Sequence, residues 1–157
     1  MIRAVVLLVL ALSACTVPGE PVPGSGPVTA RVDVQFRPVE EVVPGGRASP
    51  PDVLVDGDGV AYRLAAGIGD FTRFDDVRAE VDPQGTWVVT IDLTAEDAAV
   101  FERWTAENTG SQLAIVVDGE VVTAPVIQSA ITGGTVQIAG NHTREEAEEL
   151  AEAIAGG

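Results

Sequence analysis

Apolar and polar residues alternate in two neighbouring segments near the middle of the chain. In 77–82 the odd positions are apolar and the even positions are charged, and in 86–93 Trp87, Val89, Ile91 and Leu93 share one side. Alternation with a period of two predicts strands that are buried on one face. The segment 82–85, Asp-Pro-Gln-Gly, suits a type I turn. We therefore expect an antiparallel hairpin here.

Two further hairpins are predicted from apolar runs that flank turn residues. Val53–Asp56 and Val60–Leu64 enclose Gly57-Asp58-Gly59, and 112–117 and 120–128 enclose Asp118-Gly119, a dipeptide that favours a two-residue turn. A regular ladder from that second turn predicts the following register: Ile115 opposite Val122, Leu113 opposite Ala124, and Val116 opposite Val121. A short third strand follows near 137–141.

Two helices are indicated by their starting residues and by their apolar stripes. Thr94 is a suitable N-cap for a helix that ends near Gly110, and Thr143-Arg-Glu-Glu has the pattern of a capping box. Residues 147, 150, 151 and 154 then form the apolar stripe of an amphipathic helix. The order of elements predicts an α+β fold, a mainly antiparallel sheet with two helices packed on one face.

The first 51 residues have a different composition from the rest. Residues 1–14 contain Arg3 and an uncharged run of 11 residues, which suits a lipoprotein signal peptide rather than a membrane span. Leu12-Ser-Ala-Cys15 is similar to a bacterial lipobox, so we expect lipid attachment at Cys15; the alternative is an ordinary signal peptide with an incidental cysteine. Residues 15–29 are expected to form a Pro/Gly-rich tether, 30–51 an extended segment and loop, and 52–157 the folded domain.

The chain is strongly acidic, with 24 Asp and Glu against 9 arginines and no lysine, a net charge of −15. Such a charge disfavours binding to nucleic acid and to anionic lipid. Because no later segment is long and apolar enough to span a bilayer, membrane contact is expected through the lipid anchor only. We expect an extracytoplasmic protein on the outer face of a bacterial membrane.

Four segments together resemble the head subdomain of the first extracytoplasmic domain of SecD/SecDF-type protein-export subunits. They are Gly110-Ser-Gln-Leu-Ala-Ile-Val-Val-Asp-Gly, Val122-Thr-Ala-Pro-Val-Ile-Gln, Ile131-Thr-Gly-Gly and Gln137-Ile-Ala-Gly-Asn-His-Thr. A weaker likeness continues backwards through Asp82-Pro-Gln-Gly-Thr-Trp-Val-Val to Gln35-Phe-Arg-Pro-Val. The resemblance implies a non-enzymatic binding module that assists export or folding by binding emerging polypeptides, with clients or export-machinery components as partners. The alternative is a structural partner in a cell-envelope complex without client binding.

A physical route to such binding is an open strand edge, because backbone hydrogen bonds to an added strand do not depend on sequence. Pro125 has no N–H, which favours a sheet edge near 124–128. We expect the polypeptide-contacting edge at Val126, Ile127, Gln128, Ile131, Gly133 and Gly134, although the same residues would also serve simply to close the core.

Other chemistry is weakly supported by the sequence. Asp56-Gly-Asp58-Gly resembles a calcium loop but lacks the later bidentate Glu, so a turn is expected. His142 is the only histidine and is expected in a solvated loop, and Trp87 and Trp104 are expected in the core. We expect no catalytic residues, no metal and no cofactor, although paired carboxylates leave a hydrolase open.

Overall fold

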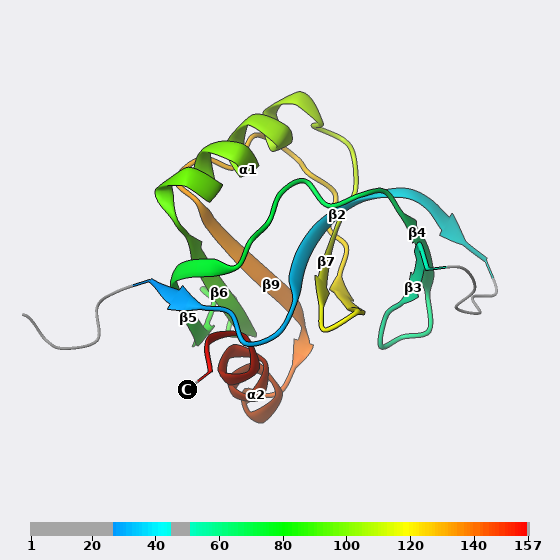
Figure 1. The fold of residues 1–157 in the computed structure, drawn as a ribbon. Helices are drawn as coiled ribbons and strands as arrows, with labels where there is room; N and C mark the ends of the chain where they lie inside the picture. Colours follow the sequence, from blue (N-terminus) through cyan, green and yellow to red (C-terminus); the bar gives the residue numbers. More distant parts are fainter. Residues whose placement is uncertain (1–26, 45–50, 157) are drawn as a thin grey trace, which may run out of the picture.

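A computed structural model describes residues 27–44 and 51–156. Within them the chain forms an α+β fold with mainly antiparallel strands, which confirms the predicted class (Figure 1). The signal peptide, Cys15 and most of the tether lie outside the described residues, and none of the helices in the described part is long and apolar enough to span a membrane. The elements are β1 (Val28–Thr29), β2 (Val34–Val43), β3 (Val53–Val55), β4 (Ala61–Leu64), β5 (Arg73–Val81), β6 (Trp87–Leu93), α1 (Ala95–Glu107), β7 (Leu113–Val117), β8 (Glu120–Thr123), β9 (Thr135–His142) and α2 (Arg144–Ala155).

The first sheet has the order β1-β5-β6-β9, with all pairs antiparallel. It contains the predicted central hairpin of β5 and β6. The Gly85 N–H donates to the Asp82 carbonyl at 3.0 Å, and the Asp82 carboxylate accepts from the N–H groups of Gln84 and Thr86. These bonds hold the turn in the form that the Asp-Pro-Gln-Gly pattern predicts.

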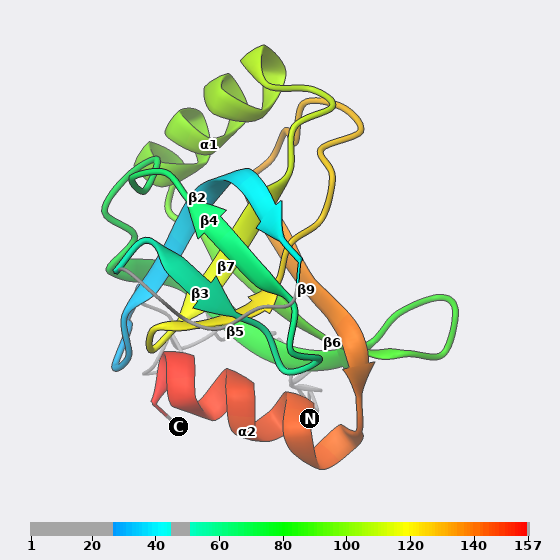
Figure 2. The same cartoon turned by 90° about the vertical axis from the view of Figure 1, so that its right-hand side faces the viewer.

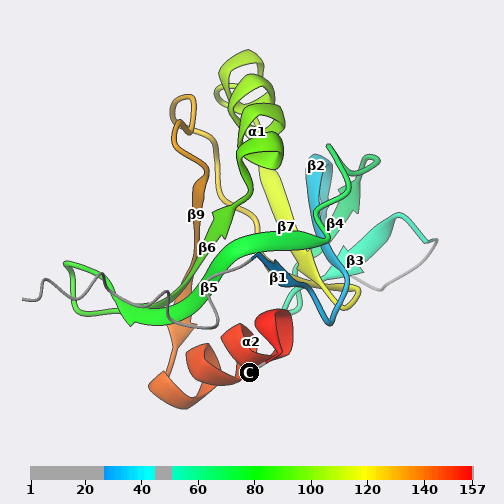
Figure 3. The same cartoon turned by 60° about the vertical axis from the view of Figure 1, so that its left-hand side comes forward.

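The second sheet has the order β3-β4-β2-β7-β8, and β2 is its central strand. The extended segment predicted for 30–51 therefore belongs to the fold, and β1 starts at Val28, inside the range assigned to the tether. A parallel bridge between Asp56 and Val121 joins the two ends of this sheet. Figure 3 shows the two sheets side by side, a division that periodicity did not predict.

A shared core joins the sheets and the helices. Phe36 of β2, Phe71 of the connection into β5 and Phe101 of α1 pack edge to face, with ring centroids 4.7 to 6.5 Å apart. Such contacts between buried rings stabilise beyond their area of burial. The same cluster of buried residues includes Phe74 and Ile91 from the first sheet and Ile115 from the second, so the two sheets share one hydrophobic core.

The two helices lie at opposite ends of the strand layer, α1 at the top and α2 at the bottom of Figure 2. Thr94 and Thr143 cap them as predicted, and the Thr143–Glu146 capping box is complete. Helix α1 ends at Glu107, with Asn108 as its C-cap, slightly before the predicted end at Gly110. Ala147, Ala151 and Ile154 are buried, so the predicted stripe of α2 faces the core.

Candidate functional site

The strand that leads into the predicted edge contains a β-bulge. Val116 pairs with Val121 as predicted, but Ile115 pairs with Thr123 rather than Val122. Val122 is therefore the extra residue, and the regular register predicted beyond it is wrong. A one-residue bulge reverses which side chains face inward further along the strand.

Beyond the bulge, the segment 125–127 stays paired with residues 111–113, at the start of β7. The regular register predicts Leu113 opposite Ala124, but the Leu113 N–H donates to the Pro125 carbonyl at 3.0 Å. The Ile127 N–H donates to the Ser111 carbonyl at 2.9 Å. Gln112 and Val126 therefore lie opposite each other in an antiparallel bridge. The N–H and C=O groups of each residue point away from the other residue. The N–H and C=O of Val126 face the outer side of this segment, which makes it the edge that Pro125 predicts.

Neighbouring residues at this edge differ sharply in exposure. Val126 is 48% exposed, whereas Ile127 is 4% exposed and belongs to the core. Gln128 is exposed and Ile131 is half-buried. Of the predicted contact residues, Val126, Gln128 and Ile131 are thus accessible, and Ile127 forms part of the floor beneath them.

The loop after the edge is anchored to α1. The Thr105 hydroxyl, fully buried, accepts a hydrogen bond from the Ile131 N–H at 3.0 Å. Gly134 has a φ of 73°, and a Cβ added there would lie 2.6 Å from the Ala98 Cβ. Gly133, with a φ of 88°, faces open space. The predicted turn residues therefore act mainly by positioning the loop against the helix.

A surface pocket of about 290 Å³ lies over this edge. It is uncharged throughout, unlike four other pockets of the described residues, each of which includes Asp or Glu. Residues from α1, β7 and β9 were missed by sequence reasoning, because only the tertiary fold brings them together. The lining consists of Phe101, Ile115, Pro125, Val126, Ile127, Gln128, Ser129, Ile131, Thr135, Val136 and Gln137.

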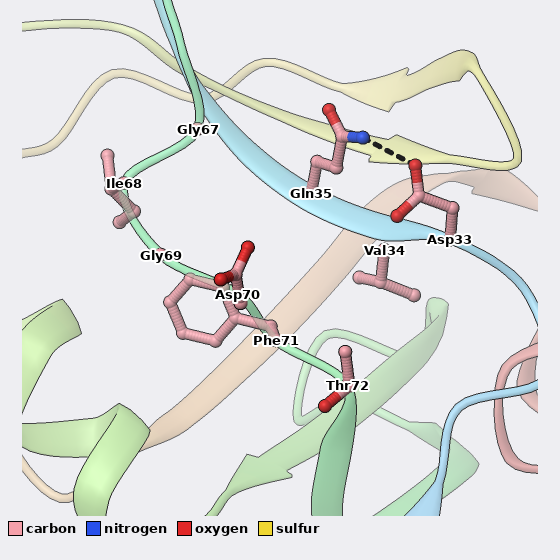
Figure 4. Close-up of a pocket in the computed structure, with 9 residues that line it drawn as sticks. All are labelled: Asp33, Val34, Gln35, Gly67, Ile68, Gly69, Asp70, Phe71 and Thr72. Atoms are coloured by element: carbon pink, nitrogen blue, oxygen red, sulfur yellow. Dashed lines mark hydrogen bonds between the residues drawn. The ribbon is translucent and has the colours of Figure 1, made fainter.

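A larger pocket, of about 420 Å³, lies between the start of β2 and the segment 67–72 (Figure 4). It contains the carboxylates of Asp33 and Asp70 on opposing walls. The Asp33 carboxylate accepts a hydrogen bond from the Gln35 amide. Over residues 27–44 and 51–156, no three His, Cys, Asp or Glu side chains gather as metal ligands would. The described residues around this pocket therefore form no cluster of metal ligands.

The loop that resembles a calcium site is a hairpin turn, as expected. The Asp56 carboxylate accepts hydrogen bonds from the Asp58 and Val60 N–H groups and from the Tyr62 hydroxyl at 3.0 Å. Burial of the Tyr62 side chain, together with its bond to Asp56, raises the pKa of this phenol. The carboxylate of Asp56 is thus used within its own hairpin.

His142 does not lie in a solvated loop, so that prediction is wrong. It is the last residue of β9, half-buried, and pairs with Trp87 across a register shift. Its Nε2 atom is buried against Gly140, where an added Cβ would lie 2.8 Å away. The absence of a side chain at residue 140 makes room for the imidazole. Trp87 and Trp104 pack against the core as predicted.

Charged groups concentrate on the exposed side of β5 and β6. Arg78 lies 2.7 Å from Asp76, 3.3 Å from Glu80 and 2.6 Å from Asp92. Hydrogen bonds from Arg78 and then from Thr135 lower the pKa of Asp92. The bond from Thr90, followed by Arg78, lowers the pKa of Glu80. These carboxylates are held ionised in ion pairs, which is a structural role.

Comparisons with known proteins agree with the resemblance found in the sequence. Residues 58–157 match the family model described as SecDF, P1 head subdomain. The protein translocase subunit SecDF of Thermus thermophilus is 50% identical over 76 residues, covering 48% of this chain and 10% of the relative. The protein translocase subunit SecD of Streptomyces coelicolor is 34% identical over 128 residues, covering 77% and 21%.

A solved structure entitled "Structure and function of a membrane component SecDF that enhances protein export" has a TM-score of 0.61 and 32% identity. The match covers 80% of this chain and 62% of that one. This chain spans about a fifth or less of the length of the two translocase subunits above. Since the family model covers well over half of the residues and the fold agrees, the chain belongs to the SecDF P1 head subdomain family.

Proposed function

We propose that this domain binds unfolded polypeptides outside a bacterial membrane and thereby assists protein export. The observation that carries the proposal is an uncharged pocket at an exposed strand edge of an otherwise acidic protein. Backbone groups at such an edge bind an extended client without reading its sequence. The relatives are named as protein translocase subunits, which supports the same role.

Three of the predicted residues would contact the client directly. Val126 and Gln128 project from the edge, and Ile131 forms part of the pocket wall. Ile127, Gly133 and Gly134 would hold these residues in place rather than bind. Binding is passive in this proposal, because it uses only groups of this domain, and we expect no catalysis.

The second part of the proposal is the location. Cys15 would carry lipid, and the residues between it and β1, which starts at Val28, would tether the domain to the outer face of the membrane. Near the membrane surface the domain would meet polypeptides as they emerge from the export machinery. Components of that machinery are therefore expected partners as well as clients.

Site-specific crosslinking in membranes that export a secretory precursor tests the client site. A photoreactive residue at Val126 should crosslink to the translocating precursor. Val81 of β5 is the matched control, because it is 49% exposed against 48% for Val126 but lies outside the pocket. We expect precursor adducts at residue 126 and few or none at residue 81.

Equal labelling at the two positions, or labelling at residue 81 alone, would reject the site. A single folded partner crosslinked at residue 126, with no precursor, would favour the structural role in a cell-envelope complex. The two readings are thus separated by the identity of the adduct.

A further inference from the structure

We infer that β9 is the pairing edge of this site and that the segment it takes is an uncharged, extended strand. The inference rests on the proposed function and adds the partner strand and the chemical class of the bound segment. Its starting point is the position of β9, which is the last strand of the first sheet and runs beside the segment 124–134 (Figure 3).

The pairing of β9 with β6 determines which N–H and C=O groups of β9 point away from the sheet. The Leu93 N–H donates to the Gly134 carbonyl at 2.8 Å, and Asp92 pairs with Thr135. This places Thr135 in a pair whose own N–H and C=O groups point away from β6. The alternation repeats every second residue, so the groups of Gln137 also point outward.

Thr135 and Gln137 both line the uncharged pocket, with exposed side chains. Donors and acceptors two residues apart, roughly 7 Å along a strand, match the backbone of an added strand. Across the pocket lies the exposed Val126, and the buried Phe101 and Ile115 contribute to the lining. The site thus offers the outward backbone groups of β9 on one side, and on the other it offers apolar side chains together with the outward N–H and C=O of Val126.

The absence of charged residues from the pocket lining restricts the class of segment that can bind. Every residue of the lining is uncharged although the chain carries a net charge of −15. A charged client residue placed against apolar side chains would lose its hydration without gaining an ion pair. A segment in which small polar and apolar residues alternate fits this site. Its backbone can pair with β9, and its apolar side chains can contact the apolar lining.

Binding of a fluorescent peptide, Gly-Val-Thr-Val-Thr-Val-Gly, to the full-length protein in detergent tests the inference. Gln137→Pro removes one outward N–H, and proline is tolerated on an edge strand. Loss of that hydrogen bond should weaken binding about tenfold. Ala139→Pro is the matched control: residue 139 also faces outward in β9 but lies outside the pocket lining, and we expect less than a twofold change.

A second measurement uses wild-type protein, so it does not depend on whether either variant folds. A fully N-methylated form of the peptide has no backbone N–H donors, and it should bind at least tenfold more weakly if strand pairing holds it. Equal binding of both peptides would overturn the inference, as would equal effects of the two proline variants. Self-pairing of β9 in a dimer, seen by sedimentation and abolished by Gln137→Pro, would overturn it as well.

These outcomes are distinct from failure of the proposed function. Precursor crosslinks at residue 126 together with unimpaired binding by Gln137→Pro would retain client binding and reject β9 as the pairing edge. Strand pairing by the purified protein without precursor crosslinks would retain the edge and reject the role in export.

Discussion

Asp92, on the outer face of β6, stabilises the fold through its side-chain hydrogen bonds. Its carboxylate accepts from the Arg78 guanidinium at 2.6 Å and from the Thr135 hydroxyl at 2.8 Å. Both bonds favour the ionised form, so the pKa of Asp92 is lower in the folded protein than in the unfolded chain. The carboxylate therefore stabilises the fold at neutral pH and loses this contribution as the pH falls through its folded pKa.

Asp92→Asn should lower the free energy of unfolding at pH 7 by about 1 kcal/mol or less, as is usual for partly exposed ion pairs. The difference from wild type should shrink as the pH falls below about 5, because the wild-type carboxylate then becomes protonated, first in the unfolded chain. Urea unfolding at several pH values measures this difference in the free energy of unfolding. Asp76→Asn is the control, since Asp76 is 53% exposed and contacts the same arginine. A difference for Asp92→Asn that stays constant down to pH 2 would contradict this account.

Short sequence patterns predicted the role of a residue correctly where its hydrogen-bond partners are near in sequence. The caps at Thr94 and Thr143 and the turn at Asp82 bond within a few residues, so the pattern alone identifies them. The environment of His142 could not be predicted in this way. Its burial depends on the absent side chain of Gly140 and on a register shift opposite Trp87.

At the scale of elements, the bulge at Val122 decides which residue of the edge is buried. A regular ladder would turn Val126 inward and Ile127 outward, and the structure has the reverse. The existence of the hairpin and its Asp118-Gly119 turn followed from sequence, and both turn residues have positive φ, as that turn requires. The bulge did not follow, because packing of Val122 and Ile127 against the distant core favours it.

The junction between α1 and the start of β9 depends on Gly134. Gly134→Ala should destabilise the protein by about 2–4 kcal/mol, since it adds a left-handed conformational cost to a clash with Ala98. Gly133→Ala has the same kind of backbone cost but faces open space, so about 1–2 kcal/mol is expected. Urea unfolding of both variants measures the difference, and equal losses would show that α1 yields without cost.

For the whole molecule, the hydrophobic pattern predicted the α+β class but not the assignment of strands to sheets. Strands β2 and β7 are far apart in sequence, and Phe36 of β2 pairs with Ile115 of β7, a contact that no local pattern predicts. The uncharged pocket was partly anticipated through its edge. Its walls from α1 and β9 come from other segments that no local pattern links to it.

The proposed attachment of the chain to the membrane through Cys15 has a direct test. Cys15→Ser should move the protein from the membrane fraction to the soluble extracytoplasmic fraction, because acyl chains contribute about 0.8 kcal/mol per buried methylene. Thr16→Ser, at the next position, should leave the protein in the membrane fraction. Fractionation and labelling with a radioactive fatty acid measure both. Continued membrane association of Cys15→Ser would reject lipid anchoring at this residue.

The open margin of β9 also bears on solubility. Edge strands without charged side chains tend to pair with the same strand of a second copy. The part of β9 that contains Thr135 and Gln137 is uncharged. The net charge of −15 opposes that encounter through long-range repulsion. Because dissolved ions shorten the range of this repulsion to about 8 Å at physiological ionic strength, concentrated stocks of this protein should keep best in dilute buffer. The acidity thus opposes self-association at an edge that, in the proposed function, stays free to bind a client.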